Sequence, residues 1–373
     1  MKGYYIHYRD IRNPVSNMTG SDKKVKGQIA AFNKAGLNCE FLFCPHPEEL
    51  LPMVKSCLPG CSDGVKWPNP EIMKEVNYLY IRKPRFFSKD FVDFLKRVKQ
   101  VNPDLFVVCE IPTYPYDKEM MRPKILLAYL KDKKYRFQLN GLIDYFADLS
   151  NSNTIFGLPT IPFYNGIDIK SISVREPTSP DDTLNLLAVA YFEFWHGIDR
   201  LVKGLKHYYE NDGTKNIHVH LVGDGGAISE IKNEVEKYHL QANFSFYGSL
   251  MPSEIDPIYA KCQMAVSSLG MHRLDPNIIA SSLKSREYLA KGIPFIFSSK
   301  IDIFEKYPND FCLELPATDD PIDINSIINK YDELSSMYSP NDIISLVREY
   351  AEGTISIDIA MRDVIEVIRG ACS

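Results

Sequence analysis

Strand-like and helix-like segments alternate along the whole chain, and this alternation constrains the fold more than any other feature. Short apolar runs such as GYYIHY (residues 3–8) and LNLLAVAYF (184–192) are typical of buried strands. Between such runs lie segments with helical spacing, for example FVDFLKRVKQ (91–100). Strands that alternate with helices predict a parallel sheet with helices packed on both faces. We therefore predict an α/β protein.

The pattern starts again near residue 170, which predicts two doubly wound domains. A chain of 373 residues is too long for one compact core, which favours the same division. We place the first domain at 1–169, the second at 170–353 and a terminal helix at 354–373. The segment VREPTSPDD (174–182) is the best linker candidate. Ligands of such sheets bind beyond the carboxyl ends of the strands, here in a cleft between the domains.

The terminal segment SIDIAMRDVIEVIRG (356–370) has an apolar stripe at helical spacing. A terminal helix has little reason to carry such a stripe unless another surface covers it. From the sequence alone, this helix could pack on either domain.

The composition restricts the compartment and the partners. A net charge of −5 argues against a dedicated nucleic-acid binder, and eight scattered cysteines indicate reduced thiols in a cytoplasmic protein. The N-terminal MKGYYIHYRD is not a signal peptide, and no apolar run approaches the ~20 residues of a membrane span.

Lysines and aromatic residues mix in YLKDKKYRF (129–137), a candidate for peripheral contact with an anionic membrane; an ordinary exposed helix end is the alternative.

The turn LVGDGGAISEI (221–231) connects a strand to a helix through glycines. Gly223, Gly225 and Gly226, with Asp224 between them, would let a phosphate or nucleotide approach the backbone at a helix N-terminus. A purely structural turn is the alternative. The spacing differs from the dinucleotide fingerprint, which argues against a nicotinamide enzyme.

The segment SSLKSREYLAKG (281–292) predicts a helix with charges at its start. Ser281 or Ser282 can cap it and Gly292 can end it. Lys284, Glu287 and Lys291 share one face. A helix N-terminus with Lys284 and Arg286 suits an anion, and a carboxylate suits ribose hydroxyls, so the segment fits a nucleoside diphosphate. A solvated charged face is the alternative.

The segment WHGIDRL (195–201) begins a second helix after a strand. His196 and Arg200, one turn apart, are candidates to hold a diphosphate. The alternative is a capped surface turn with Trp195 in the core.

Two loops of the first domain are candidate acceptor sites. Thr19 and Gly20 stand just before a helix, where a phosphate or an acceptor could bind. The loop CEIPTYPYDKE (109–119) combines stiffening prolines with tyrosine rings of the kind that sugar sites use. Its candidate residues are Glu110, Thr113, Tyr114 and Tyr116.

Taken together, these segments resemble the retaining GT-B glycosyltransferases of family 4, which build bacterial surface polysaccharides. The resemblance covers the chain from about residue 2 to the end, in the family's order. Its motifs are NGID (165–168), WHGIDRL, LVGDGG, FYGSLMPSEIDPIYAKCQMAVSS (246–268), SSLKSREYLAKGIPFI (281–296) and, for one subgroup, EIPTYPYDKE. It implies a GT-B fold, with two Rossmann-like domains facing a central cleft. It also implies that the terminal helix at 354–373 crosses back, packs on the first domain and forms part of the hinge for cleft closure.

The resemblance also implies roles for individual residues. Glu287 matches the glutamate that holds the donor ribose, and Lys284 matches a basic residue near the donor diphosphate. The implied catalytic residues are Lys284, Arg200 and Glu287, and the implied donor-binding residues are Leu283, Arg286, His196, Gly223, Asp224 and Gly225.

The chain departs from the family at three positions. His196 and Tyr191 stand where the family has a phosphate-binding lysine and arginine, and Arg200 is a candidate to compensate. Ile279 stands where the family has the first of two glutamates, which touches the donor sugar. Asp275 or Asn277 is a candidate substitute from a shifted loop.

The expected activity is transfer of a sugar from a UDP-sugar to a saccharide or lipid-linked saccharide, with retention of configuration. No cofactor and no metal are expected. The alternatives are a catalytically inactive glycosyltransferase-like subunit, favoured by Ile279, and a GT-B sugar-nucleotide epimerase or phosphorylase.

Overall fold

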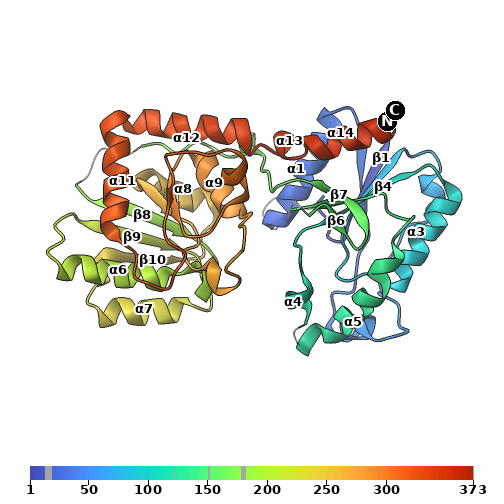
Figure 1. Ribbon diagram of the computed structural model, residues 1–373, viewed down its shortest axis with the longest axis horizontal. Coiled ribbons are helices and arrows are strands. Elements are labelled where there is room, and N and C mark those ends of the chain that lie inside the picture. The colour runs from blue at the N-terminus through green and yellow to red at the C-terminus, as the bar shows by residue number, and fades with distance from the viewer. Residues whose placement is uncertain (13–18, 122, 150–151, 178–181, 373) are drawn as a thin grey trace. The chain divides into compact units, whose positions relative to one another are not determined.

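The computed structural model describes residues 1–12, 19–121, 123–149, 152–177 and 182–372. The chain forms two compact units, one of Met1–Gly166 with Ile357–Ser373 and one of Ile167–Ser356 (Figure 1). The predicted boundaries lie three residues away at each crossing. Ile167 donates its N–H to the carbonyl of Ile355 (3.1 Å) and forms a bridge with Ser356, so these crossing residues pair with each other inside the second unit.

The first unit contains a seven-stranded sheet in the order β2-β1-β3-β4-β5-β7-β6. Every neighbouring pair is parallel except β6 with β7. The strands are β1 (Gly3–His7), β2 (Cys39–Phe43), β3 (Tyr78–Arg82), β4 (Phe106–Ile111), β5 (Tyr145–Asp148), β6 (Thr154–Ile155) and β7 (Leu158–Pro162). Its helices are α1 (Gly20–Lys34), α2 (Leu50–Cys57), α3 (Lys89–Val101), α4 (Asp117–Met120), α5 (Leu126–Tyr135), α13 (Ile357–Ala360) and α14 (Arg362–Ala371).

Successive residues of the first sheet point into different cores, as the period of a strand requires. Tyr5 of β1 joins a core with residues of α1 and α14, whereas Ile6 joins a core with residues of α3 and α5. The terminal segment, expected as one helix, is divided at Met361 into α13 and α14.

The second unit contains a six-stranded, fully parallel sheet in the order β10-β9-β8-β11-β12-β13. Its strands are β8 (Leu184–Val189), β9 (Ile217–Val222), β10 (Phe244–Gly248), β11 (Met264–Val266), β12 (Phe295–Phe297) and β13 (Leu313–Glu314). Its helices are α6 (Ile198–Glu210), α7 (Ile228–Lys237), α8 (Pro252–Lys261), α9 (Leu283–Lys291), α10 (Asp302–Lys306), α11 (Ile324–Met337) and α12 (Pro340–Thr354). Two 3₁₀ turns matter below, η6 (Phe194–His196) and η8 (Met271–Arg273).

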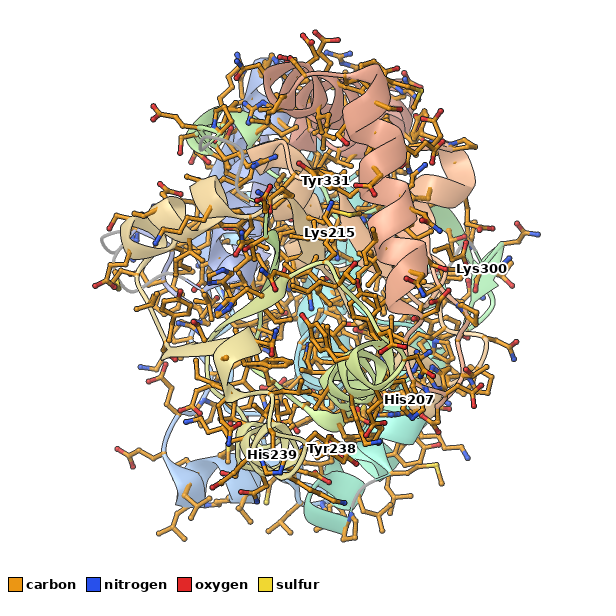
Figure 2. The ribbon with its side chains drawn as sticks, turned by 90° about the vertical axis from the view of Figure 1, so that its left-hand side faces the viewer. His207, Lys215, Tyr238, His239, Lys300 and Tyr331 are labelled. Carbon is orange, nitrogen blue, oxygen red and sulfur yellow. The ribbon has the colours of Figure 1, made fainter. Side chains whose placement is uncertain are left out.

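Helices cover both faces of this sheet: Figure 1 shows α6 and α7 on one side and α8 and α9 on the other. At the outer surface Lys215 lies over the ring of Tyr331, 5.9 Å from its centroid, and pairs with Asp332 (Figure 2). The predicted α/β class with two doubly wound parallel sheets is confirmed.

The segment 174–182 is not a linker between the units, because its described part lies inside the second unit. Arg175 donates to the carbonyls of Cys262 (2.7 Å) and Gly292 (3.2 Å), which anchors this segment beside α9. Residues 178–181 of the predicted linker lie outside the described residues.

Candidate functional site

The carboxyl edge of the second sheet brings several predicted site residues together. Because β8, β9, β11 and β12 are parallel, the loops that follow them lie at one edge. The loop after β8 carries η6 with His196, the loop after β9 is the glycine turn, and α9 begins at this edge before β12. The geometry of these three segments therefore defines the candidate site.

The glycine turn packs directly against the backbone of the loop after β8. Gly223 (φ 125°) and Gly225 (φ 142°) have conformations that other residues rarely adopt. A Cβ at Gly223 would lie 1.8 Å from the carbonyl oxygen of Ala190, and one at Gly225 would lie 2.2 Å from that of Phe192. These glycines are therefore required for backbone packing. Asp224 is exposed, and its carboxylate accepts the N–H of Gly225 (2.8 Å).

His196 is held in one tautomer by its own turn. Its Nδ1 accepts the backbone N–H of Glu193 (3.0 Å), so in the neutral ring the proton is on Nε2. Burial, and secondly the charge of Lys284, lower the pKa of His196 to about 3. His196 is consequently a neutral hydrogen-bond donor at physiological pH, close to Lys284.

Lys284 lies in the first turn of α9 and is half-buried. Burial lowers the pKa of its ammonium to about 7. Within the described part of the chain, the ammonium has no hydrogen bond or ion pair. A partly desolvated cation without a carboxylate partner is a feature of anion sites.

The start of α9 lacks the side-chain cap that the sequence predicts. Ser282 occupies the N-cap position, but its hydroxyl accepts no backbone N–H of the first turn. Instead, its carbonyl accepts the Ser285 hydroxyl (2.8 Å). An α-helix whose first N–H groups are not capped by a side chain favours an anion there. Gly292 ends the helix with φ 75°, as predicted.

Glu287 and Leu283 lie on the same helix as Lys284. Glu287 is exposed one turn further along α9. Burial of Tyr259, and secondly the charge of Glu287, raise the pKa of the Tyr259 phenol. Leu283 is the first residue of α9 and is half-buried.

Arg286 is buried inside the unit, which corrects its prediction as a donor-binding residue. Its guanidinium pairs with Asp302 of α10 and donates to the Ser285 hydroxyl (3.2 Å). Lys291, expected to share the face of Lys284, is likewise buried and pairs with Asp256 of α8. These two charges hold α9 in place, since a buried charge needs a partner.

Arg200 is also a structural residue, which corrects its prediction as a cation for the diphosphate. The side chain is fully buried in α6 and donates to the carbonyls of Asp320 (2.8 Å), Pro316 (3.0 Å) and Leu269, and to the Ser298 hydroxyl (3.2 Å). With these four acceptors engaged, the guanidinium cannot compensate for the cations that the family has at His196 and Tyr191.

Two of the three positions that depart from the family lie at the surface. Tyr191 and Ile279 are exposed, the latter in the segment between η8 and α9. The predicted substitutes are in the same segment: Asp275 accepts the N–H of Asn277 (3.0 Å), and Asn277 is exposed. The role of these two residues stays a prediction.

In the first unit, Glu110 is an internal residue, which corrects its prediction as an acceptor contact. At the end of β4 it is fully buried, and its carboxylate accepts Lys24 (3.0 Å), Arg82 (3.2 Å), Gln28 (2.8 Å) and Tyr80 (2.9 Å). Burial alone would raise the pKa of Glu110, but the two cations and the amide outweigh it and lower the pKa to about 2. Glu110 therefore remains ionised and joins β3, β4 and α1.

The start of α1 is closed by its own side chains. Thr19 is the N-cap, Asp22 receives the Thr19 N–H (2.9 Å) and hydroxyl (2.7 Å), and the Thr19 oxygen receives the Asp22 N–H (3.3 Å). This capping box occupies the groups that the sequence assigns to a phosphate or an acceptor. Thr19 and Gly20 themselves are exposed.

The loop after β4 divides into a packed part and an accessible part. Tyr116, predicted to face an acceptor, is buried and donates to Asp132 (2.9 Å), so that prediction is corrected. Its ring and that of Tyr114 both contact Phe156. Thr113 is exposed and Tyr114 is half-buried, so these two residues remain accessible.

A buried polar pair that the sequence did not suggest joins His7, at the end of β1, with Asp22 of α1. His7 is buried with its Nε2 3.7 Å from Asp22 Oδ1, and neither atom has a hydrogen-bond partner among the described residues. Burial, and secondly Arg82, lower the pKa of His7 to about 4. No sequence signal distinguishes His7 from the strand residues around it.

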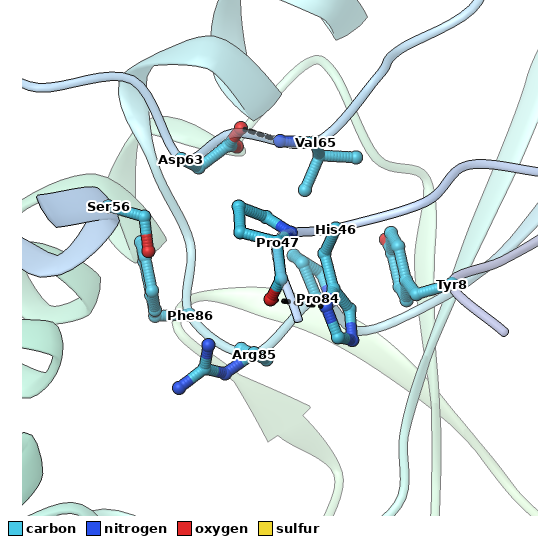
Figure 3. A pocket seen from close by; sticks show the side chains of 9 residues that line it. All are labelled: Tyr8, His46, Pro47, Ser56, Asp63, Val65, Pro84, Arg85 and Phe86. Carbon is cyan, nitrogen blue, oxygen red and sulfur yellow. Dashed lines mark hydrogen bonds between the residues drawn. The ribbon is translucent and has the colours of Figure 1, made fainter. Parts of the chain in front are cut away.

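A small cavity lies beyond the carboxyl ends of β1, β2 and β3 (Figure 3). Its volume of about 10 Å³ admits about one water. Asp63 lies at its rim and accepts the Val65 N–H (2.9 Å), and burial raises the pKa of that carboxyl. The lining residues are Tyr8, His46, Pro47, Ser56, Asp63, Val65, Pro84, Arg85 and Phe86.

The segment predicted to touch a membrane is only partly exposed. Tyr129, Lys131 and Arg136 are buried, and Arg136 pairs with Asp117. Lys133, Lys134 and Phe137 are exposed, so contact of this segment with a membrane stays a prediction. Within the described ranges, no helix is long and apolar enough to span a bilayer, and no three His, Cys, Asp or Glu side chains are grouped as metal ligands.

Comparisons with known proteins agree with this arrangement. Residues 170–306, which contain the glycine turn and α9, match the family model described as glycosyl transferases group 1. A comparison with curated protein sequences found no match.

Solved structures similar to the whole chain include the Anabaena protein Alr3699/HepE in complex with UDP (TM-score 0.59, 14% identity, 99% of this chain and 100% of that one). They also include the lipopolysaccharide outer core galactosyltransferase WaaB, with a TM-score of 0.59, 13% identity and 99% of each chain covered. A third is the sucrose-phosphate synthase of Thermosynechococcus elongatus, with a TM-score of 0.58, 14% identity and 100% of each chain covered. At these identities the likeness establishes the fold, which is GT-B with two Rossmann-like sheets.

Proposed function

We propose that the protein is a glycosyltransferase that moves a sugar from a UDP-sugar to a saccharide or lipid-linked saccharide, with retention of configuration. We place this reaction in the synthesis of a surface polysaccharide, in the cytoplasm and at the face of its membrane. The match of residues 170–306 to the group 1 glycosyl transferases supports the reaction class. The UDP complex of the structurally similar Anabaena protein supports the nucleotide.

One observation carries the proposal: Lys284, His196 and the uncapped start of α9 meet at the carboxyl edge of the second sheet. A cation, a neutral N–H donor and a helix N-terminus suit the two phosphates of a nucleotide-sugar. In this proposal Glu287, one turn along α9 and exposed, accepts hydrogen bonds from the ribose.

In the proposed reaction, the bond between the sugar C1 and the diphosphate breaks as C1 bonds to the acceptor oxygen on the same face. The acceptor proton passes to the leaving phosphate oxygen. Negative charge develops on the diphosphate, where Lys284, His196 and the first N–H groups of α9 stabilise it. These groups act without a metal in this proposal.

The test is turnover of a panel of UDP-sugars by the purified protein, with matched GDP- and ADP-sugars as controls. NMR of the product reports the anomeric configuration. Turnover with retention supports the proposal, and an inverted product contradicts the stereochemistry. UDP binding without turnover of any donor would instead favour the catalytically inactive subunit, which the isoleucine at position 279 suggests.

Replacing Glu287 with alanine is expected to weaken UDP binding. Loss of a charge-assisted hydrogen bond to ribose costs about 1.5–3 kcal/mol, or roughly 10- to 150-fold in Kd. Isothermal titration with UDP measures the change, and Glu236→Ala, an exposed carboxylate in the last turn of α7, is the matched control. Equal affinities of wild type and Glu287→Ala would remove Glu287 from the donor site.

Donor affinity is expected to decrease as the pH rises above about 7. The pKa of Lys284 is about 7 in the free protein, so the ammonium loses its charge above that pH. A bound diphosphate favours the protonated form, so Kd should increase by up to about tenfold per pH unit. The phosphates of a UDP-sugar do not titrate here, and His196 stays neutral because its pKa is about 3. Lys284→Arg should remove the dependence, since arginine remains charged.

A further inference from the structure

The turn η6, which carries His196, is too short to fix its own position. Its backbone N–H of His196 donates to the carbonyl of Glu193 (2.9 Å), and that of Gly197 donates to the carbonyl of Phe194 over a longer distance (3.3 Å). A single 3₁₀ turn has poor hydrogen-bond geometry, so neighbouring segments decide where it lies. The place of the His196 ring therefore depends on contacts from outside η6.

The loop after β11 supplies the first of these contacts through its backbone. The N–H of Leu269 donates to the carbonyl of His196 (2.9 Å). Gly197 has φ 66°, and a Cβ there would lie 2.6 Å from the carbonyl carbon of Leu269. A Cβ at Gly270 would lie 3.2 Å from the Cα of Gly197. The two loops thus pack backbone against backbone, directly beside the histidine.

Arg273 of η8 supplies the second contact through its side chain. Its guanidinium donates to the carbonyl of Phe194 (2.7 Å) and to both carboxylate oxygens of Asp199 (2.9 Å each), while its Nε donates to Asp319 (2.6 Å). A planar guanidinium holds several acceptors in fixed directions, and hydrogen bonds between charged groups are the strong ones. Asp199 lies in the first turn of α6. Arg273 therefore joins the residues on either side of His196.

The charge of Arg273 is already compensated. Its hydrogen bond to Asp199, and further the one to Asp319, raise the pKa of Arg273. Burial alone would raise the pKa of Asp199, but its hydrogen bonds to Arg273 and Lys203 outweigh it and lower the pKa. Two carboxylates on one guanidinium leave no net positive charge to attract a diphosphate, in contrast to Lys284. Arg273 consequently acts by fixing the position of other groups.

We propose that Arg273 is a positioning residue for sugar transfer: it holds η6 so that the Nε2–H of His196 faces the diphosphate of the nucleotide-sugar. A misplacement of about 1 Å at such a contact can cost up to about 10²-fold in rate. The role towards the diphosphate rests on the proposed function, whereas the orientation of the ring does not. The turn η8 thereby becomes part of the donor site, although Arg273 itself does not touch the donor.

The orientation of His196 can be measured without any nucleotide. A long-range proton–nitrogen NMR spectrum at neutral pH identifies the protonated ring nitrogen of each histidine, and His196→Asn assigns the signal. Wild type should show the proton on Nε2, because Nδ1 accepts the N–H of Glu193. Arg273→Met should give a mixture of the two tautomers, because the released turn no longer holds Nδ1 on this N–H.

The matched control for this spectrum is Arg348→Met. The Arg348 side chain is 14% exposed, against 17% for Arg273, and it pairs with Glu352 and donates to three carbonyls outside η6 and η8. Its loss removes a similar set of bonds from the same unit. The control should therefore lower the melting temperature and keep the wild-type tautomer of His196.

UDP affinity tests whether Arg273 acts through His196. The side-chain oxygen of asparagine can accept the N–H that Nδ1 accepts, but His196→Asn has no donor at the place of Nε2. By isothermal titration, His196→Asn and Arg273→Met should each raise the Kd for UDP roughly tenfold. The double variant should raise it no further, since two residues of one pathway are not additive. Arg348→Met should bind UDP like wild type.

Three results would overturn the proposal: a wild-type tautomer of His196 in Arg273→Met, a roughly 100-fold loss of affinity in the double variant, or the same effects in Arg348→Met. Thermal melting checks folding. If Arg273→Met does not fold, Arg273→Lys replaces it, because a lysine keeps the charge but cannot hold the Phe194 carbonyl and Asp199 together. A wild type that binds no UDP would contradict the proposed function, while the NMR signals would still decide whether Arg273 orients His196.

Discussion

Replacing Lys284 with methionine is expected to lower kcat about 10²- to 10³-fold while leaving the protein at least as stable. The turnover should fall because an electrostatic contact to the leaving group contributes most in the transition state. The stability should not fall, because burial lowers the pKa of Lys284 to about 7 and the charged form is disfavoured in the folded state. Single-turnover kinetics and thermal melting measure the two effects.

The matched control is Lys261→Met, an exposed lysine at the C-terminal end of α8 in the same unit. It should retain wild-type turnover. If Lys284→Met keeps its turnover, the charge of Lys284 does not act on the leaving group. If it loses stability together with turnover, Lys284 has a structural role like that of Lys291.

Removal of residues 357–373 is expected to prevent the first unit from folding. Ile357, Met361, Val364, Ile365 and Ile368 belong to the same buried core as Tyr5 and Phe32. Burial of each such side chain stabilises by about 1.5–3 kcal/mol, and five of them together match the roughly 5–15 kcal/mol that separates a folded from an unfolded domain. Calorimetry should show the loss of one unfolding transition, with that of the contiguous second unit retained.

A pair of point variants tests the same contact without a truncation. Val364→Asp places an unpaired carboxylate in this core and should destabilise the first unit strongly. Glu366→Ala, two residues away and exposed, should have little effect. Equal melting temperatures of wild type and the truncated protein would show that α13 and α14 contribute nothing to the core.

The periodic parts of the fold could be predicted from the sequence. The apolar runs at 3–8 and 184–192 identified β1 and β8, the glycine turn marked the end of β9, and Gly292 marked the end of α9. The strands β6 and β13 were missed, because each has two residues, which is too few for a period to be recognised. The terminal segment was read as one helix because its apolar stripe continues through Met361.

The site was less predictable, because a charged residue in a sequence does not show its partner. Arg286 stands one turn into a helix that begins at the site, yet its partner Asp302 removes it from solvent. Glu110 is neutralised by Lys24, which lies 86 positions away in the sequence. Lys284 differs from both because it has no such partner among the described residues, and only the folded structure reveals this difference.

The division of the chain also sets the order in which its parts can form during synthesis. Residues 167–356 are contiguous, so the second unit contains all of its strands and helices once residue 356 has left the ribosome. The first unit needs α13 and α14 to cover Tyr5, Phe32 and the rest of their core, and these helices are made after the whole second unit. At about 5–20 residues per second, translation of the intervening 190 residues takes roughly 10–40 s. Throughout that interval the face of the first sheet that α14 covers is open to chaperones and to aggregation.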